Sequence, residues 1–288
     1  MERATRFALY ATNSPEEAKD LAAKFAADGE PVVLAAGGDG TLNAVVQGLA
    51  GSKTALGVIP AGTMNVFARE LGIPYGNFEK AFDVIEAGFI REIDLFQVNG
   101  SPFMQMAGLG FDAMVIEETT WESKKILGPL AYLLAAVKVL GEKPPLMKLR
   151  TKDGREEEGV AVLAGNGVLY GGQVPLFRMA NNQDEILDVL VFHEAGYRLV
   201  LDSITGIARG GVDLAKSVVH LQASEFAVSC DVDFPVQVDG DLLGRTSYAQ
   251  FVAMENRLRV IAPEQPMGSR FGEAMNAFWA WTRKLQGA

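Results

Sequence analysis

The chain has 288 residues, 49% of them hydrophobic and 22% charged, which is enough for one large domain or two ordinary domains with cores of their own. A net charge of −10 argues against general affinity for nucleic acid or for an anionic membrane surface. The single cysteine, Cys230, excludes an internal disulfide, and the longest apolar stretch, residues 126–140, is shorter than the roughly 20 residues that span a bilayer. Since the start of the chain does not join a basic segment to a long apolar run, we expect a cytoplasmic protein without a transmembrane segment.

The first elements predict a βαβ unit. Residues 6–11 form an apolar run of strand length, and Ser14 and Pro15 then supply an N-cap and a first turn for a helix that runs toward Ala27. A second apolar run, residues 31–35, follows. Because βαβ units form parallel sheets that bind ligands at the carboxyl edge of the strands, we expect the residues after the second run to face a ligand.

A glycine-rich stretch, residues 37–43, comes directly after that strand and opens a helix. Its members are Gly37, Gly38, Asp39, Gly40, Thr41, Leu42 and Asn43. The glycines let the backbone approach a polyanion, and the helix start presents unpaired N–H groups to phosphate. Asp39 would repel phosphate unless a divalent cation or a transferred proton lay between them, so it indicates catalysis rather than phosphate binding alone.

A second turn of the same kind follows the apolar strand at residues 55–59. This turn, residues 60–65, carries Gly62, Thr63 and Asn65 and precedes another helix. Two such turns on neighbouring strands could hold one nucleotide between them.

From about Gln97 the pattern changes to short apolar runs separated by Gly, Asn, Asp and Pro, which is typical of antiparallel strands. Helical stretches near residues 127–140 and 197–208 interrupt this mostly β region. We expect an α/β nucleotide-binding domain at residues 1–96, with residues 262–288 packing back on it, and a β-rich acceptor domain at residues 97–261.

Further motifs follow the two loops. They are Glu92-Ile93-Asp94-Leu95, Gly108-Leu109-Gly110-Phe111-Asp112-Ala113, Gly165-Asn166-Gly167 with Tyr170-Gly171-Gly172, Asp184 with Leu187-Asp188-Val189, and Gln237-Val238-Asp239-Gly240-Asp241. Together they resemble, in the same order, the diacylglycerol kinase catalytic-domain family of bacterial lipid kinases, which is related to sphingosine kinases. The resemblance covers nearly the whole chain, whereas the first loop alone is also shared with NAD kinases and phosphofructokinases.

The resemblance implies an N-terminal parallel-sheet α/β nucleotide-binding domain, a second antiparallel β-rich domain, and an active site in the cleft between them. It also implies an ATP- and Mg²⁺-dependent lipid kinase, a phosphotransferase that acts on a hydroxyl of diacylglycerol or a related lipid in phospholipid metabolism. Its nucleotide contacts would be residues 37–43 and Thr63, and Thr12 corresponds approximately to a further family threonine near the nucleotide.

The turn Asp239-Gly240-Asp241 is the candidate for the catalytic base. Two carboxylates that flank a glycine repel each other, which would raise the pKa of one of them toward the range useful for accepting a proton. By resemblance the final acid is the base, which is Asp241 here. The family usually has glutamate at this position, and aspartate is one methylene shorter.

Other acids are candidate metal ligands. Asp94, Asp112 and Asp184 could bind the catalytic Mg²⁺ directly or through water, because hard cations prefer oxygen ligands. The resemblance implies a separate structural Mg²⁺, held by the Asp184 side chain and the backbone carbonyls of Asn181 and Ile186. Glu185 stands where the family usually has glycine.

Two alternatives to a lipid kinase stay open. Family members normally begin with another strand that ends in a phosphate-facing turn, whereas this chain begins at what resembles the second strand, so a non-catalytic nucleotide- or lipid-binding homologue is one alternative. The other is a kinase of a soluble acceptor such as NAD. A lipid kinase would meet its substrate by transient, peripheral contact with the inner face of the membrane, and the sequence leaves a homodimer open.

Overall fold

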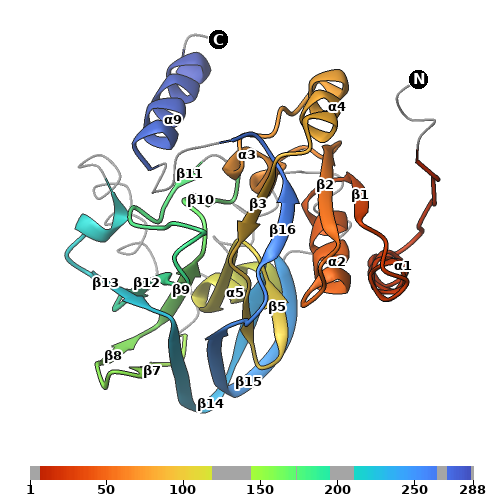
Figure 1. Ribbon diagram of the computed structural model, residues 1–288. Coiled ribbons are helices and arrows are strands. Elements are labelled where there is room, and N and C mark those ends of the chain that lie inside the picture. Colours follow the sequence, from red (N-terminus) through yellow and green to blue (C-terminus); the bar gives the residue numbers. More distant parts are fainter. Residues whose placement is uncertain (1–6, 119–143, 173, 195–210, 265–270, 287–288) are drawn as a thin grey trace. The chain divides into compact units, whose positions relative to one another are not determined.

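In a computed structural model of the protein, the described residues are 7–118, 144–172, 174–194, 211–264 and 271–286 (Figure 1). They form two compact units. The first contains the chain up to Leu95 and a segment that starts at Met254, and the second runs from Phe96 to Ala253 and includes the C-terminal helix. The expected helices at residues 127–140 and 197–208 lie outside the described residues. None of the helices in the described ranges is long and apolar enough to cross a membrane.

The first unit is built on a four-stranded sheet. Its elements are α1 (Pro15–Ala27), β1 (Val32–Gly37), α2 (Asp39–Leu49), β2 (Ala55–Pro60), α3 (Val66–Glu70), α4 (Phe78–Ala87), β3 (Ile90–Ile93) and β16 (Leu258–Ile261). The strand order is β1-β2-β16-β3, in which β1, β2 and β16 are parallel and β3 runs antiparallel to β16. The predicted α/β class with a parallel sheet is therefore confirmed.

Helix α1 begins where the sequence predicts it. The Ser14 hydroxyl accepts a hydrogen bond from a backbone N–H of the first turn at 3.2 Å, and Pro15 occupies the first helical position. The expected strand before it is wrong for residues 7–11, which pair with no strand in the described part of the chain. Tyr10 instead packs its ring against Phe25 of α1, with 5.1 Å between the centroids. An apolar run becomes a strand only where a neighbour accepts and donates its backbone hydrogen bonds.

Helix α2 packs closely against α1 through a glycine. A Cβ on Gly48 would lie 2.3 Å from the backbone oxygen of Lys19 in α1, so a larger residue does not fit there. The same helix buries Val46 and Leu49. Because α2 is tightly packed, the glycine loop at its start has a fixed position.

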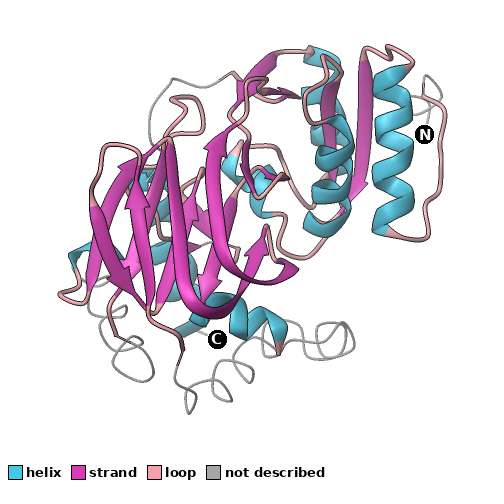
Figure 2. Ribbon diagram, turned by 90° about the horizontal axis from the view of Figure 1, so that it is seen from below, coloured by secondary structure: helices cyan, strands magenta, loops and turns pink. Residues whose placement is uncertain are grey.

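The second unit is mostly β, as predicted (Figure 2). Its elements are β4 (Phe96–Val98), β5 (Ser101–Phe103), β6 (Met106–Gly110), α5 (Phe111–Glu117), β7 (Met147–Thr151), β8 (Glu156–Gly159), β9 (Ala161–Gly165), β10 (Leu169–Tyr170), β11 (Val174–Pro175), β12 (Leu187–Phe192), a 3-10 turn (Val212–Leu214), β13 (Val218–Ala223), β14 (Glu225–Val238), β15 (Asp241–Ala253) and α9 (Phe271–Gln286). Strands β10 and β11 form a separate two-stranded pair.

The main sheet of this unit branches at β14. The strand order is β13-β12-β9-β6-β14-β15-β4-β5, with β7 paired to β14 and β8 paired to β7. Near its start β14 pairs with β7, and its last residues pair with β6 after a register shift between Ser229 and Phe234. One long strand therefore belongs to two groups of antiparallel partners.

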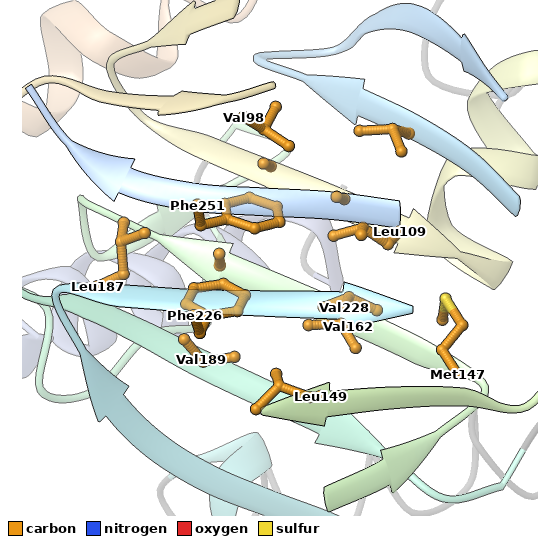
Figure 3. Packing of buried hydrophobic residues seen from close by; sticks show 14 of the residues in the cluster. Val98, Leu109, Met147, Leu149, Val162, Leu187, Val189, Phe226, Val228 and Phe251 are labelled. Carbon is orange, nitrogen blue, oxygen red and sulfur yellow. The ribbon is translucent and has the colours of Figure 1, made fainter. Parts of the chain in front are cut away.

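Apolar side chains from both groups of strands meet in one core (Figure 3). The rings of Phe226 on β14 and Phe251 on β15 are stacked with 4.4 Å between their centroids. Val162 on β9 and Val189 on β12 belong to the same cluster, and all four are 2% exposed or less. This core fixes β14 and therefore the turn at its end.

Two expected domain assignments differ from the structure. Strand β16 belongs to the sheet of the first unit rather than to residues 97–261, because β2 and β3 supply its hydrogen-bonding partners. Residues 262–288 are expected to pack on the first domain, but helix α9 belongs to the second unit. Its Ala274 and Met275 pack against an apolar cluster of the second unit that includes Phe177. Helix α9 therefore docks through its own apolar face, but on the other unit.

Candidate active site

The two predicted glycine loops lie in direct contact at the carboxyl ends of β1 and β2. Gly37 is in register with Pro60, and the Ala61 N–H donates to the Gly37 carbonyl oxygen at 2.9 Å. A Cβ on Gly62 would lie 2.4 Å from the Cα of Gly38, so the contact requires glycine. Two stretches separated in the sequence thus form one surface.

Asp39 joins the two loops by a hydrogen bond. It is the first residue of α2, and its Oδ1 accepts from the Val66 N–H at the start of α3 at 2.7 Å. Burial raises the pKa of Asp39, while the backbone N–H groups of Val66, Phe67 and Asn65 act in the opposite direction. The structure therefore gives Asp39 a positioning role, and its catalytic role stays a prediction.

Asn65 shapes the second loop from within. It is buried and left-handed, with φ 49°, and its side chain accepts from the Gly62 N–H at 3.0 Å and donates to the Gly62 carbonyl at 2.6 Å. Arg69 braces the same loop, because its Nε donates to the Met64 carbonyl at 2.5 Å. Thr63 is left exposed at the tip of this rigid turn, where a ligand can reach it.

The other predicted nucleotide contacts differ in exposure. Thr41 lies over Gly37, where a Cβ would be 2.6 Å from the Thr41 Oγ1. Leu42 and Asn43 are buried within the unit, so they can present only backbone atoms to a nucleotide. Thr12 is half-buried ahead of α1, and in the described ranges no hydrogen bond joins it to either loop.

Asp94 is committed to an ion pair. Its side chain is 1% exposed, and its Oδ1 lies 2.7 Å from the Nε of Arg257. A buried carboxylate is stable when it is paired in this way. The Arg257 guanidinium therefore occupies the carboxylate that Asp94 would offer to Mg²⁺ in its predicted role as a ligand.

The candidate base turn is held on β6 by Asp239. The turn joins β14 to β15, and Asp239 and Gly240 both have positive φ, 49° and 87°, as in a tight hairpin. The Asp239 carboxylate accepts from three successive backbone N–H groups, those of Met104, Gln105 and Met106, at 2.9, 3.0 and 2.9 Å. Asp241 follows as the first, exposed residue of β15.

The electrostatics of the turn differ from the expected repulsion between its two acids. Burial raises the pKa of Asp239 to about 6, against the effect of its three backbone donors. The charge of Asp241 is the smallest of the contributing causes. A raised pKa is therefore present in this turn, but it belongs to the clamped acid and comes mainly from desolvation.

Three residues without a predicted positioning role form a buried polar chain beneath this turn. Tyr170 donates its hydroxyl to Asp112 Oδ1 at 2.5 Å, and Gln237 donates its Nε2 to Asp112 Oδ2 at 2.9 Å. The Gly240 N–H donates to the Gln237 Oε1 at 2.9 Å. All of them lie in the quoted motifs, but only the folded chain shows that these motifs meet.

The predicted structural metal loop forms a turn in the second unit. The Oδ1 of the exposed Asp184 accepts from the Ile186 N–H at 3.1 Å, Asn181 is half-buried, and Glu185 adopts φ 60°. Such a turn and an exposed carboxylate fit a hard cation such as Mg²⁺. Among the described residues, no group of three or more His, Cys, Asp or Glu side chains could hold a metal ion.

Two family models match the chain. Residues 1–98 match the diacylglycerol kinase catalytic domain, and residues 105–262 match the YegS C-terminal NAD kinase beta sandwich-like domain. The diacylglycerol kinase of Bacillus subtilis (strain 168) is 31% identical over 262 residues, which cover 89% of this chain and 86% of that protein. The diacylglycerol kinase of Staphylococcus aureus (strain JH9) is 31% identical over 258 residues, which cover 88% and 81%.

Solved structures show the same fold. The crystal structure of a diacylglycerol kinase from Bacillus anthracis str. Sterne has a TM-score of 0.69 and 26% identity, covering 88% of this chain and 84% of that chain. An NAD kinase from Archaeoglobus fulgidus in complex with ATP has a TM-score of 0.54 and 13% identity, covering 95% and 92%, which is a likeness of fold alone.

The α/β unit with its paired glycine loops and the β-rich unit with its clamped acidic turn define a protein of the diacylglycerol kinase and NAD kinase fold. Within that fold, the chain belongs to the diacylglycerol kinase family. The predicted resemblance is confirmed.

Proposed function

We propose that this protein is a lipid kinase that transfers the γ-phosphoryl group of ATP to a hydroxyl of diacylglycerol or a related lipid. The observation that carries this proposal is the pairing of the two glycine loops, in which Gly38 and Gly62 touch and Asp39 caps α3. This rigid surface of backbone groups at the carboxyl ends of parallel strands suits nucleotide phosphates.

The reaction makes three demands on the protein. The nucleotide phosphates must be held, the acceptor hydroxyl must lose its proton, and the two substrates must be aligned. We assign phosphate binding to residues 37–43 and Thr63, whose exposed position on a braced loop supports the assignment. Thr12 is assigned to the nucleotide on the resemblance alone.

We assign the base to Asp241. Its carboxylate accepts the hydroxyl proton while the lipid oxygen forms a bond to the γ-phosphorus and the bond to the ADP oxygen breaks. Its exposure at the start of β15 and the firm attachment of the preceding turn support this role. Aspartate rather than glutamate requires the acceptor hydroxyl to lie closer to the backbone of the turn.

Mg²⁺ is proposed as the cofactor, with Asp184 and the carbonyls of Asn181 and Ile186 as the structural site. When bound, this cation would neutralise the Asp184 carboxylate and hold the loop. Asp39 lies within the proposed phosphate cradle, and its carboxylate is partly committed to the Val66 N–H. Both oxygens of Asp112 are already bonded to Tyr170 and Gln237, so we assign Asp112 no role as a ligand of the catalytic cation.

A lipid is proposed as the acceptor because the relatives that match most of this chain are named diacylglycerol kinases. A lipid acceptor requires peripheral contact with a membrane surface, which we propose is transient and on the cytoplasmic side. A soluble acceptor such as NAD, as in the NAD kinase of the same fold, is the outcome that would replace the lipid.

The test offers a panel of acceptors to the purified protein. Labelled γ-phosphate from ATP, with Mg²⁺, is offered to diacylglycerol, monoacylglycerol and sphingosine in detergent micelles, and to NAD without lipid. We expect label in an organic-soluble lipid product. Label in a water-soluble product alone would overturn the lipid assignment, and tight ATP binding without transfer to any acceptor would favour a non-catalytic protein.

A further inference from the structure

The buried polar chain ends at the backbone of the candidate base turn. It runs from the Tyr170 hydroxyl to Asp112, from Asp112 to the Gln237 amide, and from Gln237 to the Gly240 N–H, with distances of 2.5, 2.9 and 2.9 Å. Its members come from β10, α5 and β14. Gly240 is the residue directly before Asp241, so the chain connects the interior of the unit to the proposed base.

The chain has a direction that chemistry imposes. Burial raises the pKa of Asp112, and the hydrogen bonds from Tyr170 and Gln237 act in the opposite direction. In its ionised form the carboxylate only accepts hydrogen bonds, so Asp112 then selects the NH₂ side of the Gln237 amide. The carbonyl side of that amide then faces the Gly240 N–H. Without the acceptor at residue 112, the amide could rotate and place its NH₂ group opposite the Gly240 N–H, where two donors face each other.

The sequence also makes room for this contact. A Cβ on Gly108 would lie 1.9 Å from Asp112 Oδ2 and 2.7 Å from Gln237 Nε2. Only glycine at this position of β6 therefore allows the carboxylate and the amide to meet. Gln237 is 1% exposed and Asp112 is 9% exposed, so water does not replace these bonds readily.

A second anchor holds the other side of the turn. The Asp239 carboxylate binds the backbone N–H groups of Met104, Gln105 and Met106, the last of which is the first residue of β6, and its own N–H donates to the Met106 carbonyl at 2.8 Å. Gly240 thus follows a residue that is clamped to β6 and is itself held by Gln237. Two anchors on adjacent residues leave the turn little freedom to shift.

The geometry points to Asp112 and Gln237 as positioning residues that orient the turn carrying Asp241. This inference rests on the proposed function, in which Asp241 accepts the proton of the acceptor hydroxyl. Neither residue touches the reacting atoms in this account. Tyr170 orders Asp112 and therefore has a smaller, indirect effect.

The test compares Gln237→Met, which keeps the volume and removes both hydrogen bonds, with Gln222→Met. Gln222 is the matched control, because its Nε2 also donates to an aspartate, Asp188, at 3.1 Å, but Asp188 binds the Met179 N–H rather than the turn that carries Asp241. We expect Gln237→Met to lower kcat by about 10- to 100-fold with little change in KM, since a misplacement of about 1 Å costs on that order. Gln222→Met should stay within about twofold of the wild type.

Two substitutions of Asp112 test whether an oxygen acceptor at this position is enough to orient Gln237. Asp112→Asn keeps an oxygen that can accept from Gln237, whereas Asp112→Leu does not. We expect Asp112→Asn to retain more activity than Asp112→Leu at matched thermal stability. Equal losses in both variants would overturn the orienting role of the carboxylate oxygen.

Amide hydrogen exchange at Gly240 gives a readout that does not depend on activity. We expect faster exchange in Gln237→Met than in the wild type and in Gln222→Met. If the wild type phosphorylates lipid and Asp241→Asn does not, but Gln237→Met keeps wild-type kcat and slow exchange, the positioning inference is wrong. If the wild type phosphorylates nothing, the proposed function is wrong, and the exchange rates still decide whether Gln237 fixes the turn.

Discussion

The carboxylate of Asp39 accepts a hydrogen bond from the backbone N–H of Val66 at 2.7 Å, although 27 positions separate the two residues in the chain. One side chain of the first glycine loop therefore caps the helix that follows the second loop. The two loops thus act as a single structural unit, and its shape depends on a residue that also lies where phosphate is proposed to bind.

Replacing Asp39 by alanine removes this cap. We expect a loss of about 1 kcal/mol in the free energy of unfolding, as for other helix caps, and weaker ATP binding because the second loop is released. Asp39→Asn keeps an oxygen acceptor and should keep most of the stability while losing the charge. Urea unfolding and ATP titration of both variants separate these effects, and unchanged stability in Asp39→Ala would contradict the capping role.

The close approach of the two loops predicts a strong effect of one added methyl group. In Gly62→Ala the new Cβ would lie 2.4 Å from the Gly38 Cα, so the loops must separate. We expect a destabilisation of about 1 to 3 kcal/mol and a clear loss of ATP affinity. Gly272→Ala in α9 is the control, because a Cβ there has no atom within 4 Å. An equal ATP affinity in both variants would argue against the paired loops as the cradle.

The raised pKa of Asp239 predicts a pH dependence of stability. Because the pKa is about 6 in the folded protein against an ordinary 3.8, the folded state binds the proton more tightly than the unfolded state. The contribution of Asp239 is therefore most favourable at low pH and is lost as the pH rises through this range. At about 1.4 kcal/mol per unit, the change is at most about 3 kcal/mol, since the half-buried residue keeps some contact with solvent.

The comparison with Asp239→Asn isolates that contribution. Unfolding free energies of both proteins are measured from pH 4 to pH 7.5, and we expect the wild type to lose stability relative to the variant as the pH rises. If the wild type instead gains stability relative to the variant as the pH rises, the three backbone N–H donors lower the pKa of Asp239 by more than burial raises it. Either result identifies the dominant influence on the Asp239 carboxylate.

The backbone conformation of Glu185 predicts that its replacement by glycine stabilises the protein. It adopts φ 60°, a left-handed conformation that costs a non-glycine residue about 1 kcal/mol. We therefore expect Glu185→Gly to raise the free energy of unfolding by about that amount. Glu158→Gly, at an exposed position of strand β8, should instead lower it. Chemical denaturation of the two variants checks the prediction, which fails if both are destabilised equally.

The glycine loops and the α/β class could be predicted from the sequence because their signals are local. Residues 37–43 and 60–65 each follow an apolar strand within a few positions, and the parallel pairing of those strands brings them together. The β-rich second part was equally visible, as short apolar runs between turns. The resemblance added the order of the motifs and the family.

The contacts that depend on distant parts of the chain could not be predicted in the same way. Gln237 and Asp112 are 125 positions apart, and nothing local to either shows that Gly108 makes room for them to meet. Strand β16 has the same apolar character as the strands of the second unit, and only its partners β2 and β3 assign it to the first. Residues 7–11 have the composition of a strand but no partner strand in the described ranges, and composition cannot show this.

The most direct test of the central claim is the rate of phosphoryl transfer from ATP to dispersed diacylglycerol by the wild type, Asp241→Asn and Asp231→Asn. Asp231 is the control, since it is an exposed aspartate within β14 and away from the turn. We predict phosphorylated lipid from the wild type and Asp231→Asn, and a rate lower by about 100-fold or more in Asp241→Asn, as for loss of a general base. Equal rates in all three proteins would contradict the assignment of Asp241 as the base of a lipid kinase.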